Sequence, residues 1–388
     1  MRKPFDLYSP DIDRDPFPMY EWLREEHPAY WNEADKYWVL SRYDDVLNAA
    51  QDWETYSSTG GNLIDEIPGR TGATLGTTDP PRHDRLRALA QAAFMKKNFE
   101  YIVEPTKEVA AESADLCARQ GTFDYVADFS SNITVKVLMP LMGLPVLEPA
   151  DIRNRVVLAI STDRTTRGRN EELNAAFKWI TEFIAREVEN RRQNSQDDLV
   201  TRLAEAEIDG DRLDDREVML TTATFVMAGI ESLSSFMTTL ALNLHDHAGA
   251  RERVIADPSL MPKAIEESLR YNTSAQRFKR TVAKEHQLHG KTLHKGERVV
   301  VAYGSANRDP RKFENPDVYD IDRNPRGHLG FGYGKHLCLG SQLARMVSEV
   351  ALNTFLERIP NFELTTRDFP WVSSSNFRSP KELPFKVA

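Results

Sequence analysis

Hydrophobic positions along the chain recur mostly at the three- and four-residue spacing of amphipathic helices. Residues 86–94 and 343–355 show this spacing most clearly, and similar patterns dominate elsewhere. Signals for strands are short, and the best of them are residues 37–42 and 297–304. The pattern therefore predicts a mainly α-helical protein with a small β region.

One predicted helix is unusually long and apolar. The segment from Val218 to Leu244 contains 27 residues and a single charged side chain, Glu231. We predict a helix through the core, because threonines and serines interrupt the apolar run too often for a membrane span. Gly229 in its middle costs about 1 kcal/mol relative to alanine. Because an unpaired buried carboxylate is costly, Glu231 is either a functional group or a structural glutamate paired with a distant arginine.

A long irregular stretch separates the last predicted strand from the last predicted helix. Residues 305–337 are rich in proline and glycine and end directly before Cys338. Structureless runs of this length are uncommon unless they are functional or disordered, and the aromatic residues here favour an ordered, functional one. No linker-like composition divides the chain, so we expect residues 1–388 to form a single domain.

Composition narrows the class of protein. The chain is 40% hydrophobic and 28% charged, as is usual for a soluble enzyme, and its net charge of −9 argues against general affinity for nucleic acid. Two cysteines cannot build a disulfide framework, which favours a reducing compartment. The first twenty residues carry acids and prolines where a signal peptide needs an apolar run. We therefore expect a cytoplasmic protein that binds neither nucleic acid nor a membrane.

Cys338 lies in the most glycine-rich stretch of the chain, GFGYGKHLCLG at residues 330–340. The helix predicted directly after it should lower the pKa of the thiol, and the glycines allow backbone and a flat ligand to approach closely. A buried structural cysteine and a nucleophile with His336 as its base are alternatives. Zinc fits poorly, because no further cysteine or histidine pair lies at ligand spacing. A thiolate ligand of haem iron suits the glycines better.

A second cluster of polar residues occurs in the stretch TTDPPRHDRLR at residues 77–87. We expect Asp79 to cap a helix whose first turn contains Pro80 and Pro81. His83 and Arg87 are four residues apart and share one face of that helix. Cations so close to a helix N-terminus oppose the helix dipole, so they either form a solvated face or bind an anion.

Taken together, these stretches resemble the cytochrome P450 family over nearly the whole chain. The haem-binding signature of that family, Phe-x-x-Gly-x-x-x-Cys-x-Gly, is matched by Phe331, Gly334, Cys338 and Gly340. The signature is specific, and the other motifs follow in the order that the family has. The resemblance implies a triangular, mainly α domain with a small β region, and haem b between the central helix and the Cys338 loop.

The resemblance also implies roles for single residues. Cys338 would be the axial ligand of the iron, and Glu267, Arg270 and Arg323 would form a salt-bridged triad that holds the irregular stretch. His83 and Arg87 would bind one haem propionate, and Arg280 and His336 the other. The full set of expected cofactor-binding residues is His83, Arg87, Ala228, Gly229, Arg280, Phe331, Gly332, His336, Cys338 and Gly340.

The stretch AGIES matches the oxygen-activating part of the family's central helix, with one departure. The family usually has an acid followed by threonine, whereas this chain has Glu231 followed by Ser232. Serine keeps the hydroxyl group but lacks the methyl group that restricts the rotamer. We expect Glu231 to deliver protons and Ser232 to hydrogen-bond to dioxygen, with less tight coupling of electron use to product.

The function implied is that of a bacterial haem-thiolate monooxygenase. It would insert one atom of O₂ into a small organic substrate, with electrons from NAD(P)H delivered by a ferredoxin or flavodoxin. The segments YGSANRDP and FRSPKELPFKVA look most like bacterial members that oxidise small methoxy- or alkyl-substituted aromatics and benzoates. A peroxygenase driven by H₂O₂ and a non-catalytic haem sensor are the alternatives. The redox partner is expected at the face near Cys338, where Arg85, Lys96, Lys97 and Lys335 would form a basic patch.

Overall fold

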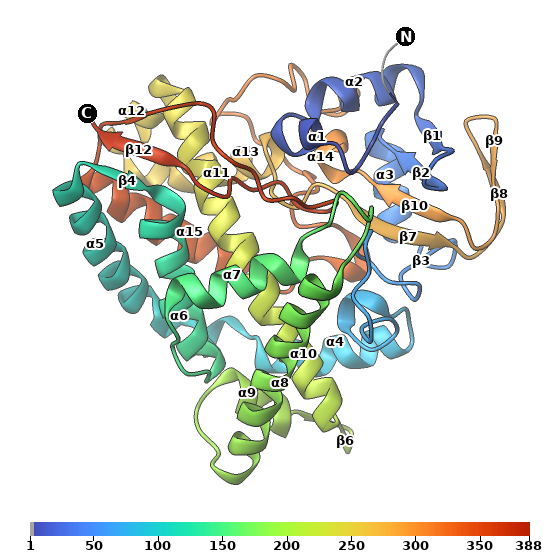
Figure 1. Cartoon of the computed structure of the whole chain (residues 1–388), viewed down its shortest axis with the longest axis horizontal. Coiled ribbons are helices and arrows are strands. Elements are labelled where there is room, and N and C mark those ends of the chain that lie inside the picture. The colour runs from blue at the N-terminus through green and yellow to red at the C-terminus, as the bar shows by residue number, and fades with distance from the viewer. Residues whose placement is uncertain (1–3) are drawn as a thin grey trace.

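Helices build most of the molecule, as the hydrophobic pattern predicts, and they give it a triangular outline (Figure 1). The computed structural model describes residues 4–388, so the first three residues of the predicted domain lie outside the described part. The α-helices are α1 (Pro10–Arg14), α2 (Phe17–Glu26), α3 (Tyr43–Gln51), α4 (Arg82–Ala93), α5 (Val103–Gln120), α6 (Ser131–Met142), α7 (Pro149–Ile160), α8 (Glu171–Gln193), α9 (Leu199–Glu205), α10 (Asp215–Met227), α11 (Leu233–Asp246), α12 (Ala248–Ala256), α13 (Met261–Tyr271), α14 (Tyr303–Ala306) and α15 (Ser341–Arg358).

The β structure is small and lies mainly in one corner (Figure 1). The strands are β1 (Ala29–Asn32), β2 (Tyr37–Leu40), β3 (Tyr56–Ser57), β4 (Thr122–Asp124), β5 (Glu207–Ile208), β6 (Asp211–Arg212), β7 (Phe278–Val282), β8 (His286–Leu288), β9 (Lys291–Leu293), β10 (Arg298–Val301), β11 (Phe362–Leu364) and β12 (Pro384–Val387). The largest sheet has the order β1-β2-β10-β7-β3, with β2 and β10 parallel and the other pairs antiparallel.

Both strands expected from the sequence are present in that sheet. β2 is buried at every position, which explains its continuous apolar run. The strand expected at 297–304 is shorter, because the chain turns at Ala302 into α14. β7 lies beside β10 and carries Arg280 toward the centre of the molecule.

The predicted central helix is continuous from Asp215 to Asp246, but it contains a turn of π-helix, η5 (Ala228–Ser232). Its start is set by Asp214, whose side chain accepts a hydrogen bond from the Glu217 backbone N–H at 2.7 Å, while Glu217 reaches back to the Asp214 N–H. A π-helical turn widens the backbone locally, and such turns are frequent at functional sites.

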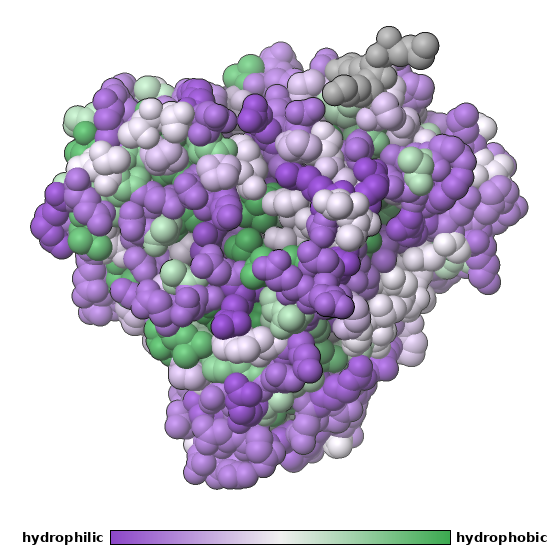
Figure 2. Space-filling model, in the orientation of Figure 1, coloured by the Kyte–Doolittle hydropathy of each residue, from purple (hydrophilic) through white to green (hydrophobic). Residues whose placement is uncertain are grey.

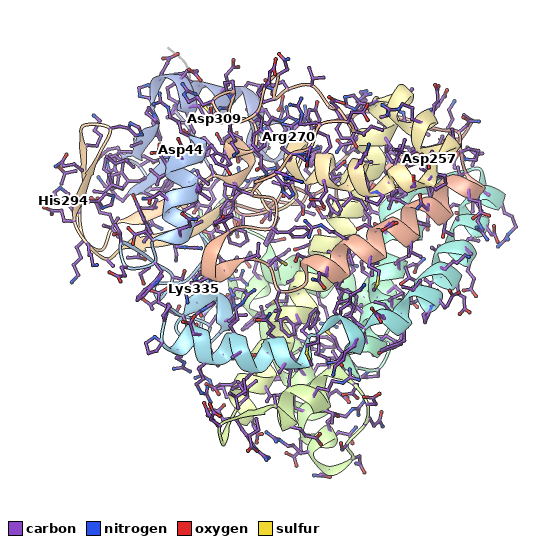
Figure 3. The ribbon with its side chains drawn as sticks, turned by 180° about the vertical axis from the view of Figure 1, so that it is seen from behind. Asp44, Asp257, Arg270, His294, Asp309 and Lys335 are labelled. Carbon is purple, nitrogen blue, oxygen red and sulfur yellow. The ribbon has the colours of Figure 1, made fainter. Side chains whose placement is uncertain are left out.

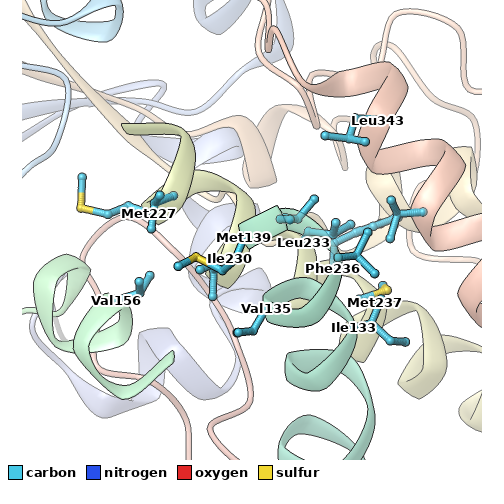
Figure 4. Packing of buried hydrophobic residues seen from close by; sticks show 14 of the residues in the cluster. Ile133, Val135, Met139, Val156, Met227, Ile230, Leu233, Phe236, Met237 and Leu343 are labelled. Carbon is cyan, nitrogen blue, oxygen red and sulfur yellow. The ribbon is translucent and has the colours of Figure 1, made fainter. Parts of the chain in front are cut away.

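The central helix is long and apolar enough to cross a membrane, yet it forms the core of the fold. In its most apolar window, 78% of the residues are buried inside the protein. Its side chains belong to the same buried cluster as residues of α6, α7 and α15 (Figure 4). Those labelled in the figure are Met227, Ile230, Leu233, Phe236 and Met237 from the central helix, and Ile133, Val135, Met139, Val156 and Leu343 around it. Figure 2 shows the contrasting outer surface, which is largely hydrophilic on this face.

The irregular stretch before Cys338 is ordered, as its aromatic residues suggested. Apart from the end of α14 and a short 3₁₀ turn at Gly334–His336, residues 305–337 contain no helix or strand. The expected triad holds this stretch: Glu267 bonds Arg270 at 2.7 and 2.9 Å, and Arg323 reaches Glu267 at 3.2 Å. Arg270, which is labelled in Figure 3, also donates to the carbonyl of Pro316 at 2.7 Å. Helix α13 is thereby tied to the loop that leads to Cys338.

Candidate functional site

A cavity of about 360 Å³ lies between the central helix and the Cys338 loop. It is bounded by α4, by η5, by strand β7 and by the loop of residues 330–340. Ten of the residues expected at the site line this cavity: Arg87, Ala228, Gly229, Ser232, Arg280, Phe331, Gly332, His336, Cys338 and Gly340. The fold therefore brings together residues that are far apart in the sequence.

The Cys338 loop is fixed by its own backbone. The N–H of Cys338 donates to the carbonyl of Phe331 at 2.9 Å, and α15 begins three residues later at Ser341. Two of its glycines are required by neighbouring protein, since a Cβ at Gly330 would lie 2.6 Å from the Leu269 carbonyl oxygen and one at Gly334 would lie 2.8 Å from that of Ala50. The close approach of backbone expected at these glycines is therefore present at Gly330 and Gly334.

Cys338 is enclosed by the protein, yet its side chain is exposed to the cavity. Burial raises the pKa of the thiol, while the Gly340 N–H, Arg87 and Arg345 lower it. The helix start therefore does not by itself produce a thiolate, contrary to the expectation from sequence, because loss of solvation outweighs the nearby donors and cations. A bound metal cation is what deprotonates such a ligand.

A group of basic side chains stands beside the cavity, and among the described residues Asp84, 3.1 Å from Nδ1 of His83, is the one acid paired with it. The rings of His83 and His336 lie 4.6 Å apart, edge to face, and Arg87 and Arg280 line the cavity beside His336. Burial and the neighbouring Arg280, His83 and Arg87 hold the pKa of His336 at about 2. The buried Nε2 of His83 has no hydrogen-bond partner. A ligand with two anionic groups would satisfy this cluster, so the residues fit the two propionates of haem.

The start of α4 differs from the prediction. The helix begins at Arg82, and Asp79 does not cap it. The Asp79 carboxylate instead accepts hydrogen bonds from the Ser57 hydroxyl at 2.5 Å and from the Ser58 N–H at 3.0 Å. Asp79 thus ties this helix to the segment after β3, and the Ser58 hydroxyl in turn lies 3.1 Å from His336 Nε2.

Glu231 and Ser232 face different surroundings. Ser232 lines the cavity, whereas Glu231 is 1% exposed and is not part of the cavity wall. Glu231 Oε2 lies 3.6 Å from Nε of Arg153, which comes from α7. Burial raises the pKa of Glu231, and Arg153 opposes that shift. The structure therefore contains the pairing with a distant arginine that was one of the two interpretations of Glu231.

Arg153 was not identified from the sequence. It has no motif around it, and α7 becomes a neighbour of η5 only in the fold. The pair is loose, since neither the carboxylate oxygens of Glu231 nor Nε of Arg153 has a hydrogen-bond partner. Unsatisfied groups of this kind are costly where no water reaches them, and they are typical of functional sites.

The basic patch expected near Cys338 is largely neutralised. Arg85 is bound by Glu217 at 2.9 Å and by Asp211, Lys335 is bound by Asp84 at 2.9 Å, and Lys96 lies 3.4 Å from Glu100. Among the four predicted cations, Lys97 is the one for which the described residues provide no ion pair. Figure 3 shows Lys335 on this face, close to the start of α15. Except for Glu100, which is four residues from Lys96, the acids come from distant segments, so the sequence pattern overstated the positive charge.

Comparison with known proteins identifies the family. The family model for cytochrome P450 matches residues 150–370, more than half of the chain. Cytochrome P450 123 of Mycobacterium tuberculosis is 34% identical, with 98% of this chain and 96% of that protein covered. The cyclomarin C epoxidase CymV of Salinispora arenicola is 30% identical over 94% of this chain and 95% of its own length. The solved structure of the polyketide synthase cytochrome P450 PksS of Bacillus subtilis 168 matches with a TM-score of 0.90 and 28% identity, covering 99% of this chain and 100% of the other.

The chain belongs to the cytochrome P450 family. It has the cytochrome P450 fold, and it is an oxidoreductase of the haem monooxygenase class. Its cofactor is haem, whose iron takes a cysteine thiolate ligand, and Cys338 is the cysteine that lines the cavity.

Proposed function

We propose that the protein inserts one atom of O₂ into a small organic molecule, with electrons from NAD(P)H delivered by a ferredoxin or flavodoxin. One observation carries this proposal: a single cavity places the Cys338 side chain and the π-helical turn with Ser232 around one enclosed space. When bound there, haem supplies the activation of O₂. We also propose that residues 1–388 act as a single haem domain.

The residues of the chain would hold the haem from three sides. Cys338 provides the iron ligand, and Arg87, Arg280, His83 and His336 provide donors and positive charge for the propionates. Gly229 lines the cavity, and its lack of a side chain lets α6 pack closely, because a Cβ there would lie 3.0 Å from Leu138 Cδ1. The apolar side chains of the wall exclude water, which limits the loss of reactive species to solvent.

Proton delivery is assigned to Glu231 and Ser232. Ser232 lines the cavity, and its hydroxyl would hydrogen-bond to dioxygen there. The Glu231 carboxyl group is buried behind the same turn, where a raised pKa suits a group that must accept and release protons near neutral pH. Arg153 would hold Glu231 in place between these transfers, because their contact is electrostatic and leaves the carboxylate oxygens free.

The substrate class that we propose is a small methoxy- or alkyl-substituted aromatic molecule. Aromatic side chains that could pack against such a ring contribute to the cavity wall, among them Phe225, Phe278 and Phe377. Ser232 in place of threonine favours a second candidate, a peroxygenase driven by H₂O₂, because it weakens the control of proton delivery.

We further propose that the redox partner binds at the face near Cys338 and that the protein acts in the cytoplasm. Lys335 is exposed on that face (Figure 3), and Lys97 is exposed as well. Since most of the cations there have acidic partners, packing would contribute more than steering by net charge to this docking.

The test is turnover of the purified holoenzyme under ¹⁸O₂ with NADH, a ferredoxin and its reductase, using small alkyl- and methoxybenzenes as probes. One ¹⁸O atom in the product supports the proposal. Product formed with H₂O₂ but with no reductase system would select the peroxygenase. A protein that binds these probes and consumes neither NADH nor H₂O₂ would be a haem sensor.

A further inference from the structure

The wall of the cavity contains a buried guanidinium group that the proposed chemistry does not use. Arg70 lines the cavity and is only 4% exposed. Its Nη1 donates to Glu66 at 2.9 Å and its Nη2 to Asn62 at 3.3 Å, whereas its buried Nε has no partner. A guanidinium carries five N–H donors. Arg70 therefore has donors to spare at the edge of a mainly apolar space.

The loop around Arg70 is built before any ligand arrives. The carbonyl of Arg70 accepts hydrogen bonds from the Thr77 hydroxyl at 2.7 Å and from the Ala73 N–H at 2.9 Å. The carboxylate of Glu66 accepts the N–H groups of Leu63 and Ile67. Binding to Arg70 would therefore require little further ordering of the chain, which is a condition for useful affinity.

The charges around Arg70 do not balance. Arg70, Lys279 and Arg169 share their electrostatic surroundings with Glu66 and Asp65. Lys279 is buried, and the others are buried or half-buried, so solvent screens them only in part. Arg298 adds a further positive charge that acts on Lys279, so the positive charges around Arg70 outnumber the two negative ones. A negative charge in the cavity would offset part of this excess.

We propose that Arg70 and Asn62 bind the carboxylate of the substrate, and that the substrate is a small monocarboxylic acid with an apolar body. This inference rests on the proposed function and narrows its substrate class. A carboxylate offers the single charge and the paired acceptor oxygens that a guanidinium recognises. A haem propionate is a poorer candidate for this position, because Arg87, Arg280 and His336 form a separate cluster for such groups.

The first experiment compares acids with neutral isosteres on the wild-type holoenzyme. 4-Ethylbenzoate and octanoate are titrated against 4-ethylbenzamide and octanamide at pH 7, and binding is followed by the shift of the Soret band. Each acid should bind about tenfold to a hundredfold more tightly than its amide, the range expected for charge-assisted hydrogen bonds. Equal or weaker binding of the acids overturns the proposal.

The second experiment uses Arg70→Gln and Arg70→Lys, with Arg216→Gln as the control. Arg216 donates to the neighbouring Gly69 carbonyl but does not line the cavity. Arg70→Gln should lose the preference for acids while keeping its haem and its affinity for amides, Arg70→Lys should keep part of the preference, and the control should behave as wild type. Loss of haem from Arg70→Gln, or an unchanged preference, overturns the role of Arg70.

The two proposals fail in different ways. Acids that bind through Arg70 but are never oxidised with the ferredoxin system contradict the proposed function and leave this inference standing. Oxidation of neutral aromatics without any preference for acids contradicts this inference and leaves the proposed function standing.

Discussion

Replacing Glu267 by glutamine tests whether the buried triad holds the loop that leads to Cys338. Both Glu267 and Arg270 are 0% exposed. Glu267 Oε1 accepts from Arg270 Nη2 at 2.7 Å, from Arg323 Nε at 3.2 Å and from the Asp320 N–H at 3.0 Å, and Oε2 accepts from Arg270 Nε at 2.9 Å. The Glu267 carboxylate therefore accepts four hydrogen bonds inside the protein.

The amide has the same shape as the carboxylate, but it must turn an N–H toward one guanidinium donor. At least one charge-assisted hydrogen bond is then lost, which costs about 1.5–3 kcal/mol. The buried charge of Arg270 also loses its counter-ion. Removing one partner of a buried ion pair typically costs about 3–5 kcal/mol, and we expect Glu267→Gln to fall in that range.

The assay is urea unfolding of the holoenzyme, followed by tryptophan fluorescence and by the Soret band. Arg253→Gln is the control, because its pair with Asp322 spans 2.9 Å but the side chains are 48% and 55% exposed, so that it should cost only about 0–1 kcal/mol. In Glu267→Gln the haem should also be released at lower urea than in wild type, since Arg270 holds the Pro316 carbonyl of the irregular stretch. A cost for Glu267→Gln no larger than that of the control would refute this reasoning.

Four other predictions concern the site and the surface near it. The reduced carbon monoxide complex of a thiolate-ligated haem shows a red-shifted Soret band, and Cys338→His should abolish it. An unchanged spectrum in this variant would mean that another residue is the iron ligand. Glu231→Gln should slow turnover by up to about 10²-fold and enlarge the solvent isotope effect, as loss of a proton donor does. Ser232→Ala should keep NADH consumption near the wild-type rate but divert it to H₂O₂, and Ser232→Thr should improve coupling; full coupling in Ser232→Ala would remove the serine from the mechanism. Lys97→Glu should slow reduction by an acidic ferredoxin at low salt more than Lys96→Glu does, because Glu100 already offsets the charge of Lys96. Stopped-flow measurements at several salt concentrations give the two reduction rates, and equal rates in the two variants would contradict the prediction.

Local features of the chain were predictable because they depend on neighbours in sequence. The spacing of apolar residues located the central helix and α15, and a continuous apolar run located β2. The four-residue separation of His83 and Arg87 and the three-residue separation of Glu267 and Arg270 placed each pair on one helical face. The glycine-rich signature around Cys338 indicated, through resemblance to its family, the loop that borders the cavity.

Contacts between distant segments were decided only by the tertiary structure. The partner of Glu231 is Arg153 on α7, and nothing near Arg153 in the sequence marks it. Arg85 becomes neutralised because β6 brings Asp211 beside it, so the expected basic patch is weaker.

The properties of the groups that surround the cavity were also decided only by the tertiary structure. Burial, which periodicity cannot quantify, keeps the thiol pKa of Cys338 high despite the helix start. Arg70 becomes a candidate binding residue only in the folded chain, because folding places its buried guanidinium group in the apolar wall of the cavity. Secondary structure follows from short-range patterns, whereas desolvation and charge balance depend on every segment that packs against a group.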